Sequence, residues 1–318
     1  MTQATASADA PLASGRSSTW VRLSRRTEAP PGEPRRIGYL YILPALLVYG
    51  AFVLVPFAHT AWLSLHEWDG VTSPTWAGLE NYRSVLTDPH VRATFGHALV
   101  LIVFYSLLPL VLGLVLAASL SRMRVRGLTF FRAVLFLPQV VSLVAVGIIW
   151  KWILGPEGSL NQALRGLGLE SAARPWLGDF GWALPSIGLV GTWVMYGLAM
   201  VLLVAGVQKI PASLYDAARV DGAGPVREFF AVTLPWVRNE VVVVLVLTTT
   251  TALRSFDLVY VMTQGGPGTT TEVPSYRLYT AAFQTGQAGL GAAIGITLAI
   301  VIFALAFAIT RIGERRAA

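Results

Sequence analysis

An all-α membrane protein with six transmembrane helices is the fold class that this sequence predicts. Of its 318 residues, 54% are hydrophobic and only 13% are charged. A soluble domain carries about one quarter charged residues. The apolar residues also gather in runs close to the ~20 residues that a helix needs to cross a bilayer. Length alone would allow two soluble domains, but these runs favour one helical membrane domain.

Six such runs follow one another, each separated from the next by a more polar segment. Pro138 lies inside the third run, where we expect a kink or local unwinding because proline cannot donate the helical hydrogen bond. The predicted spans cover residues 38–65, 97–120, 130–153, 184–207, 241–262 and 290–310.

The distribution of cations predicts the orientation of these spans. Arginines are concentrated before the first run, after the second, after the fourth and after the sixth, and the intervening segments carry fewer. Positively charged segments lie preferentially in the cytoplasm, so both termini are predicted there. The net charge of +7 could suggest a nucleic-acid partner, but its distribution favours membrane orientation instead.

Two domains are expected on the same grounds. Residues 1–36 are rich in Ala, Ser, Pro and Arg without a helical apolar period, and we predict a disordered basic cytoplasmic tail. Residues 37–318 would form the transmembrane domain, which includes a polar cytoplasmic loop at about residues 209–237.

Proline and glycine occur in that polar loop at positions typical of helix starts and ends. Pro211 suits the first position of a helix, and Asp221-Gly222 suits its end because glycine readily adopts the left-handed conformation. Gly224-Pro225 would begin a second helix, and Pro235 would prevent its simple continuation. We therefore predict two short helices joined by a bend at glycine, on the water side of the membrane.

This loop resembles the signature loop of the membrane subunits of binding-protein-dependent ABC importers, which begins Glu-Ala-Ala and continues with a glycine and a Leu-Pro pair. One position departs from the pattern, because an aspartate replaces the glutamate. The matching residues are Asp216, Ala217, Ala218, Gly222, Leu234 and Pro235.

Outer segments extend the resemblance to nearly all of residues 38–311. WAGLENY at residues 76–82, GSLN at residues 158–161 and TQGGPG at residues 263–268 are similar to segments of the sugar-permease branch, particularly its MalF- and UgpA-like half. The resemblance implies a MalF-like type I ABC importer permease fold in a bacterial inner membrane, and a sugar or sugar-like solute.

In that family the loop is a coupling helix that docks into a groove on a cytoplasmic ATPase. The resemblance implies that Asp216 faces a cation of the ATPase, that Ala217 and Ala218 allow close approach, and that Gly222 makes the bend. Asp221, Leu234 and Pro235 are predicted to belong to the same coupling segment. It also implies a second permease subunit in a heterodimer, two ATPase subunits and an extracytoplasmic solute-binding protein. The alternative is an amphipathic helix at the membrane surface without a partner.

Enzyme chemistry is not indicated. The sequence has no GxxxxGK[ST] phosphate loop and no GxSxG nucleophile motif. It has no cysteine, and its four histidines are widely separated, so neither residue type predicts a metal site. We expect a transport subunit without a catalytic residue, metal or cofactor, driven by ATP hydrolysis in partner subunits.

Ionisable residues inside a span are candidates for function. Arg254 and Asp257 are three residues apart in the fifth predicted span, so on a continuous helix they would share a face and could pair. A structural ion pair near the outer interface is at least as good an interpretation.

Hydroxyl residues in the same span suggest a path for the solute. Thr248, Thr251 and Ser255 have a spacing that would align them on one helical face, where they could bond a sugar or bond back to their own helix. From the fourth span, the family resemblance implies that Gly191, Met195 and Leu198 face the same path. Trp193 and Tyr196 are nearby rings that could stack on a sugar or serve as packing.

A secondary transporter driven by an ion gradient is the alternative function. It predicts inverted repeats and a carboxylate at mid-span, and the sequence shows neither clearly. An exporter or a structural scaffold would leave the signature loop unexplained. The sequence does not identify the solute.

Overall fold

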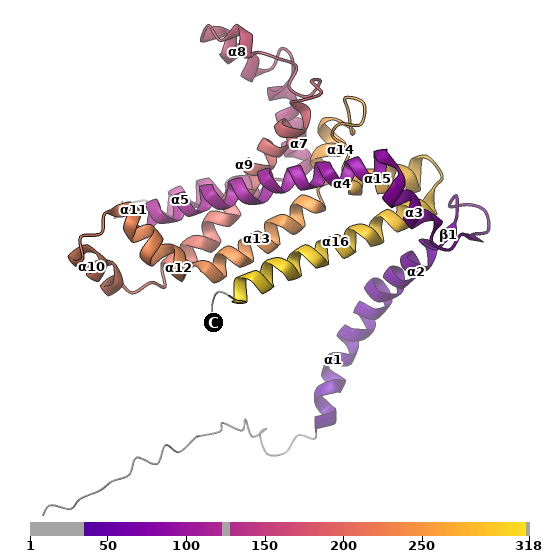
Figure 1. The fold of residues 1–318 in the computed structure, drawn as a ribbon, viewed down its shortest axis with the longest axis horizontal. Helices are drawn as coiled ribbons and strands as arrows, with labels where there is room; N and C mark the ends of the chain where they lie inside the picture. The colour runs from indigo at the N-terminus through magenta and orange to yellow at the C-terminus, as the bar shows by residue number, and fades with distance from the viewer. Residues whose placement is uncertain (1–34, 123–127, 316–318) are drawn as a thin grey trace, which may run out of the picture. The chain divides into compact units, whose positions relative to one another are not determined.

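The computed structural model describes residues 35–122 and 128–315, and Figure 1 shows that these residues are mostly helical. Of the predicted tail, residues 1–36, only the last two residues belong to the described part, as the start of helix α1 (Arg35–Tyr49). Arg124 and Arg126, which contribute to the predicted orientation, lie outside the described residues.

Contacts divide the chain into two units after Leu54. The first unit holds α1 and the π-helical turn η1 (Gly50–Leu54). Between Tyr39 and Tyr49 its side chains are exposed, as expected of an apolar segment whose surroundings are lipid or other subunits. The second unit begins with α2 (Val55–Leu63) and contains all the later elements.

Four helical segments are long and apolar enough to cross a membrane, and the number rises to six if each of two bent helix pairs counts as one span. The prediction of six spans agrees with the higher number. The four continuous segments are Tyr39–Leu63, Pro89–Ser119, Ala183–Val207 and Ala288–Glu314. Pro89–Ser119 comprises α4 (Pro89–Ile102), the π-helical turn η2 (Val103–Leu107) and most of α5 (Leu108–Arg122).

The third predicted span is one of the bent pairs. Helices α6 (Leu128–Val140) and α7 (Leu143–Ile153) meet at an angle of 93°. Pro138 lies inside α6, and the break follows at residues 141 and 142, just beyond the position where a kink was expected.

The fifth predicted span is not one continuous helix. Helix α13 (Arg238–Leu253) ends before Arg254, and a separate helix, α14 (Asp257–Met262), follows. At the break, the Ser255 carbonyl accepts a hydrogen bond from Ser275 Oγ of the next helix, α15 (Pro274–Tyr279). Such tertiary partners satisfy backbone groups that a broken membrane helix would otherwise leave unpaired.

Helix α9 (Ala183–Val207) forms the centre of the second unit, where it packs against η2, α5, α6 and α13 (Figure 1). In the apolar 18-residue stretch of α9, 67% is buried inside the protein, against 28% of the corresponding stretch in Pro89–Ser119. Small residues allow this close packing: a Cβ on Gly188 or Gly191 would meet the Phe104 or Tyr105 ring, and Gly113 of α5 lies against Ala199. Membrane helices depend on such approach because lipid offers no hydrophobic driving force between helices.

Two asparagines hold the loops at the end of the unit away from α10–α12. Asn81, in α3 (Glu80–Thr87), donates to the carbonyls of Ser64 and His66 and so fixes the two-residue strand β1 (His66–Glu67), which pairs antiparallel with β2 (Thr75–Trp76). Buried Asn161, in α8 (Ser159–Gly166), donates to three carbonyls and accepts from Trp176 Nε1. The asparagines in the WAGLENY and GSLN segments therefore have structural roles here.

The remaining elements complete the second unit. A single 3₁₀ turn, η3 (Glu170–Ala172), follows α8. Helix α10 (Ala212–Val220), α11 (Pro225–Glu228), the π-helical turn η4 (Phe229–Thr233) and α12 (Leu234–Trp236) connect α9 to α13. After α15 come the π-helical turn η5 (Thr280–Gln284) and the long helix α16 (Ala288–Arg315).

We expect Gly191→Ala to destabilise the protein by about 1–3 kcal/mol, because the new methyl group would overlap the Tyr105 ring in a closely packed core. Gly96→Ala in α4 is the matched control: nothing lies within 4 Å of its Cβ position, so alanine's helix propensity would leave stability equal or slightly higher. The melting temperature of the detergent-purified protein measures both. Equal melting temperatures would contradict the proposed packing.

Candidate functional site

Helices α10 and α11, with the turn at residues 221–224, form a structure that we call the coupling hairpin (Figure 1). Pro211 precedes α10 as its N-cap, one position earlier than predicted. At the other end, Gly222 N–H donates to the Arg219 carbonyl and Ala223 N–H to the Ala218 carbonyl, and Gly222 has a φ of +76°. This pair of bonds with a left-handed glycine is the Schellman motif, so the predicted bend at Gly222 is confirmed.

Polar contacts fasten the two arms of the hairpin together. Arg219 Nε of α10 donates to Glu228 Oε1 of α11 at 2.8 Å, and Arg219 Nη1 lies 3.4 Å from Asp216 Oδ1 of the same helix. The Glu228 side chain is only 4% exposed, whereas that of Arg219 is 58% exposed. A further hydrogen bond joins the hydroxyls of Tyr215 in α10 and Thr233 in η4, 3.0 Å apart, and ties the hairpin to the segment that follows it. The arms are therefore held in one geometry.

One face of the hairpin packs against the core, and the opposite face is free to receive a partner. Leu214, Tyr215 and Ala218 contact the apolar cluster that contains Ile210 and Val232. The exposed face carries four of the residues predicted for coupling to the ATPase: Asp216, Ala217, Asp221 and Gly222. Ala218, in contrast, faces the core side.

Leu234 and Pro235 lie beyond the hairpin in α12, Leu234 half-buried and Pro235 exposed. There the chain turns by 72° into α13. Sequence reasoning missed Arg219 and Glu228 as a pair. The available signal was a pair of opposite charges on the two sides of the predicted bend.

A cavity of about 240 Å³ lies at the break between α13 and α14. Two residues of the predicted solute path, Thr251 and Ser255, line it, and Arg254 and Asp257 line it as well. Because Arg254 and Asp257 belong to separate elements, they do not share a helical face as predicted. No ion pair joins them in the part of the chain that the structure describes. Two opposite charges and several hydroxyls therefore face one small polar cavity.

Thr248 has a different environment. It is buried, bonds back to the Val244 carbonyl at 2.7 Å, and contacts Ser106 Oγ of η2 at 2.7 Å. Ser255 follows the end of α13, so the expected single helical strip of hydroxyls is wrong. Ser255 instead donates to the Tyr105 hydroxyl at 3.3 Å, and Thr251 bonds back to Leu247. Thr248 stabilises helix packing, while Thr251 and Ser255 face the cavity.

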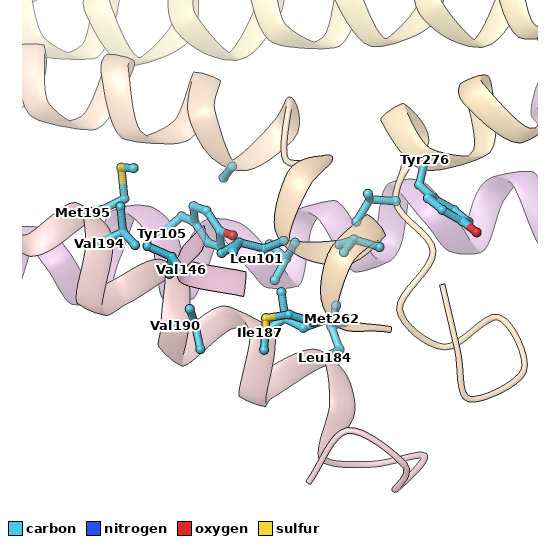
Figure 2. Close-up of a cluster of buried hydrophobic side chains, with 14 of the residues drawn as sticks. Leu101, Tyr105, Val146, Leu184, Ile187, Val190, Val194, Met195, Met262 and Tyr276 are labelled. Atoms are coloured by element: carbon cyan, nitrogen blue, oxygen red, sulfur yellow. The ribbon is translucent and has the colours of Figure 1, made fainter. Parts of the chain in front are cut away.

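The predicted residues of α9 do not line the cavity. Gly191 and Met195 are buried, with Met195 in the same apolar cluster as Tyr105 (Figure 2), and Leu198 is half-buried. Tyr105 itself lines the cavity, and Gly191 lies against the Tyr105 ring. Gly191 can therefore affect the cavity only through that ring. Trp193 packs edge-on against Trp150, which favours a packing role.

We expect Arg219→Gln to loosen the coupling hairpin, because the buried Glu228 carboxylate would lose a charge-assisted hydrogen bond. The loss is about 1 kcal/mol, since the exposed guanidinium is screened by water. Arg227→Gln, at an exposed neighbour with no ion pair among the described residues, is the control. Hydrogen exchange of the α10 amides should rise in Arg219→Gln alone. Equal exchange in both variants would show that the pair does not hold the hairpin.

Comparison with known proteins agrees with this architecture. The model of a family described as the binding-protein-dependent transport system inner membrane component matches residues 109–318. The probable ABC transporter permease protein YurN of Bacillus subtilis is 39% identical, over 85% of this chain and 93% of its own. The diacetylchitobiose uptake system permease protein NgcF of Streptomyces coelicolor is 32% identical, over 91% of this chain and 89% of its own.

A solved structure has the same fold. The crystal structure of a bacterial alginate ABC transporter, in complex with an alginate pentasaccharide-bound periplasmic protein, matches with a TM-score of 0.75 and 20% identity, covering 88% of this chain and 94% of that one. The family match spans well over half of this chain, including the coupling hairpin, the α13–α14 break and α16. The chain therefore belongs to the inner membrane components of binding-protein-dependent transport systems, the permease subunits of ABC importers.

Proposed function

We propose that this permease subunit moves a sugar or sugar-like solute into the cell, driven by separate ATPase subunits. The exposed face of the coupling hairpin is the observation that carries the proposal: it presents Asp216 beside small residues, on a loop held rigidly against the core. NgcF, a relative of similar length, serves uptake of a disaccharide, and the structurally similar transporter is an alginate transporter. The polar cavity at the α13–α14 break would be the solute path.

The partners are inferred from the family. A second permease would complete a heterodimer, two ATPases would bind the coupling hairpins, and a solute-binding protein would deliver the solute at the outer face. The alginate transporter was solved with such a periplasmic protein. ATP hydrolysis takes place in the partners, so this subunit needs no catalytic residue, metal or cofactor.

The position of the hairpin in the chain explains how a movement of the ATPases would reach the cavity. Only residues 208–211 separate α10 from the central helix α9, and α12 leads directly into α13. Lys209 Nζ lies 3.1 Å from Glu240 Oε1, which links the ends of α9 and α13 beside the hairpin. A hairpin moved as one body would therefore shift both helices together. Switching between two packed states of the spans would open the cavity alternately to each side.

The orientation follows from the arginine distribution. We place the coupling hairpin, both termini and the basic tail at residues 1–36 in the cytoplasm of a bacterium, with the spans in its inner membrane and the loops of Asn81 and Asn161 outside.

Co-purification tests the function. We expect an ATPase to accompany the wild-type permease and to be lost with Asp216→Lys, because the reversed charge would repel the cation that receives it. Glu170→Lys, an exposed charge reversal in η3 on the opposite side of the unit, is the control and should retain the ATPase. Uptake of labelled diacetylchitobiose, maltotriose and trehalose by energised cells would then test the sugar assignment.

Two results would contradict the proposal. An ATPase retained by Asp216→Lys would remove the hairpin as its docking site. Absence of any ATPase from the wild type, together with uptake abolished by a protonophore, would favour transport driven by an ion gradient.

A further inference from the structure

An aromatic cluster extends the wall of the cavity away from the coupling hairpin. Phe256 and Tyr260 stack at 5.2 Å between ring centroids, and both contact Tyr279 of α15, at 5.4 and 5.7 Å. Tyr279 in turn lies 5.6 Å from Phe283 of η5. We use the name aromatic cluster for these four residues. They bring together the α13–α14 break, α14, α15 and η5.

The cluster is continuous with the cavity. Of the four rings in the aromatic cluster, Phe256 is the one that lines the cavity. Asp257, which also lines the cavity, and Tyr260 are three residues apart on the exposed side of α14, while Leu258, Val259 and Met262 face the core. The exposed side of α14 therefore leads from the cavity to Tyr260 without a change of face.

The four rings differ in exposure. Phe256 and Tyr279 are half-buried, Tyr260 is 37% exposed and Phe283 is 76% exposed. Tyr276, which neighbours Phe256 and Tyr260, belongs to the core and supports the cluster from behind. Figure 2 shows Tyr276 well separated from Tyr105, which lines the cavity. The outer rings thus present aromatic surface that the protein's own core does not use.

The chemistry of these rings suits a carbohydrate. The face of a sugar ring carries C–H groups, whose positive ends are attracted to the negative face of an aromatic ring. The phenol groups of Tyr260 and Tyr279 add donors and acceptors for sugar hydroxyls. The cavity beyond supplies the polar groups of Thr251, Ser255 and Arg254. An apolar surface with a few polar groups is the usual composition of a ligand site.

We propose that the aromatic cluster is a sugar-binding surface that receives the solute from the outer side and passes it to the cavity. This inference rests on the proposed sugar-import function. The rings hold the sugar during transfer, so that each closure of the ATPases captures it in the cavity. Without them the sugar escapes outward while ATP is still consumed.

The test measures sugar imported for each ATP hydrolysed, in proteoliposomes that contain the complete importer with its binding protein and labelled diacetylchitobiose. Phe283→Ala and Tyr260→Ala should each lower this ratio about 2- to 10-fold, the factor expected for the loss of one ring contact. Phe283→Trp and Tyr260→Phe keep a ring and should restore the ratio. Phe303→Ala removes an equally exposed ring of α16 outside the cluster and should match the wild type.

Three outcomes would overturn the inference. An unchanged ratio in both alanine variants would show that the rings do not bind the sugar. Loss of the second permease from the purified complex would identify the cluster as a surface between permease subunits. A wild-type importer that hydrolyses ATP but imports neither diacetylchitobiose nor maltotriose would overturn the sugar assignment, while the attached ATPase would still support the permease function.

Discussion

The close contact between α9 and η2 is the constraint on which both functional regions depend. Glycines at 188 and 191 let the Phe104 and Tyr105 rings approach the α9 backbone, where any side chain would overlap them. Thr192 Oγ1 donates to the Phe104 carbonyl at 2.6 Å across the same contact. Because the surrounding lipid is as apolar as the helices, this shape complementarity and the hydrogen bond hold the helices together.

The two ends of that contact have different tasks. On one side, Tyr105 forms a wall of the cavity and meets Ser255 at the break of α13. On the other, α9 ends at Val207, which packs in the cluster that anchors the coupling hairpin. A rigid α9 therefore connects the site where force would enter to the site where the solute would pass.

Broken helices are costly in a membrane, since every free backbone group requires a partner. At the end of α13, the Ser255 carbonyl accepts a hydrogen bond from Ser275 Oγ, while the Ser255 side chain donates to the Tyr105 hydroxyl. The break exposes residues 254–257 to the cavity, which a continuous helix would turn to different sides. The same break begins the aromatic cluster at Phe256. The irregular backbone is thus what gives the cavity its polar lining.

Local patterns predicted much of this structure. The predicted fourth span, residues 184–207, differs from α9 by one residue, because the length of an apolar run is a local property. The bend at Gly222 was predictable because its left-handed φ favours glycine. The end of α13 at Leu253 was not, since residues 241–262 contain neither glycine nor proline, and the partners of Ser255 are remote in sequence.

Remote partners also decide the roles of individual side chains. Thr248 and Thr251 carry the same hydroxyl group, but the Thr248 hydroxyl is hydrogen-bonded to Ser106, 142 residues earlier in the chain. The pairing of Arg219 with Glu228 depends on the fold of the bend, although both charges are visible in the sequence. Helical periodicity could not place the aromatic cluster, because its rings come from separate elements.

The substitution Gly222→Val tests most directly whether ATP drives this permease through the coupling hairpin. Valine strongly disfavours a φ of +76°, and nothing lies within 4 Å of the new Cβ, so the change acts on the bend alone. We predict that ATP-driven uptake is lost while the melting temperature of the transmembrane core stays within a few degrees of the wild type. Uptake at the wild-type rate, with the ATPase still attached, would contradict the account.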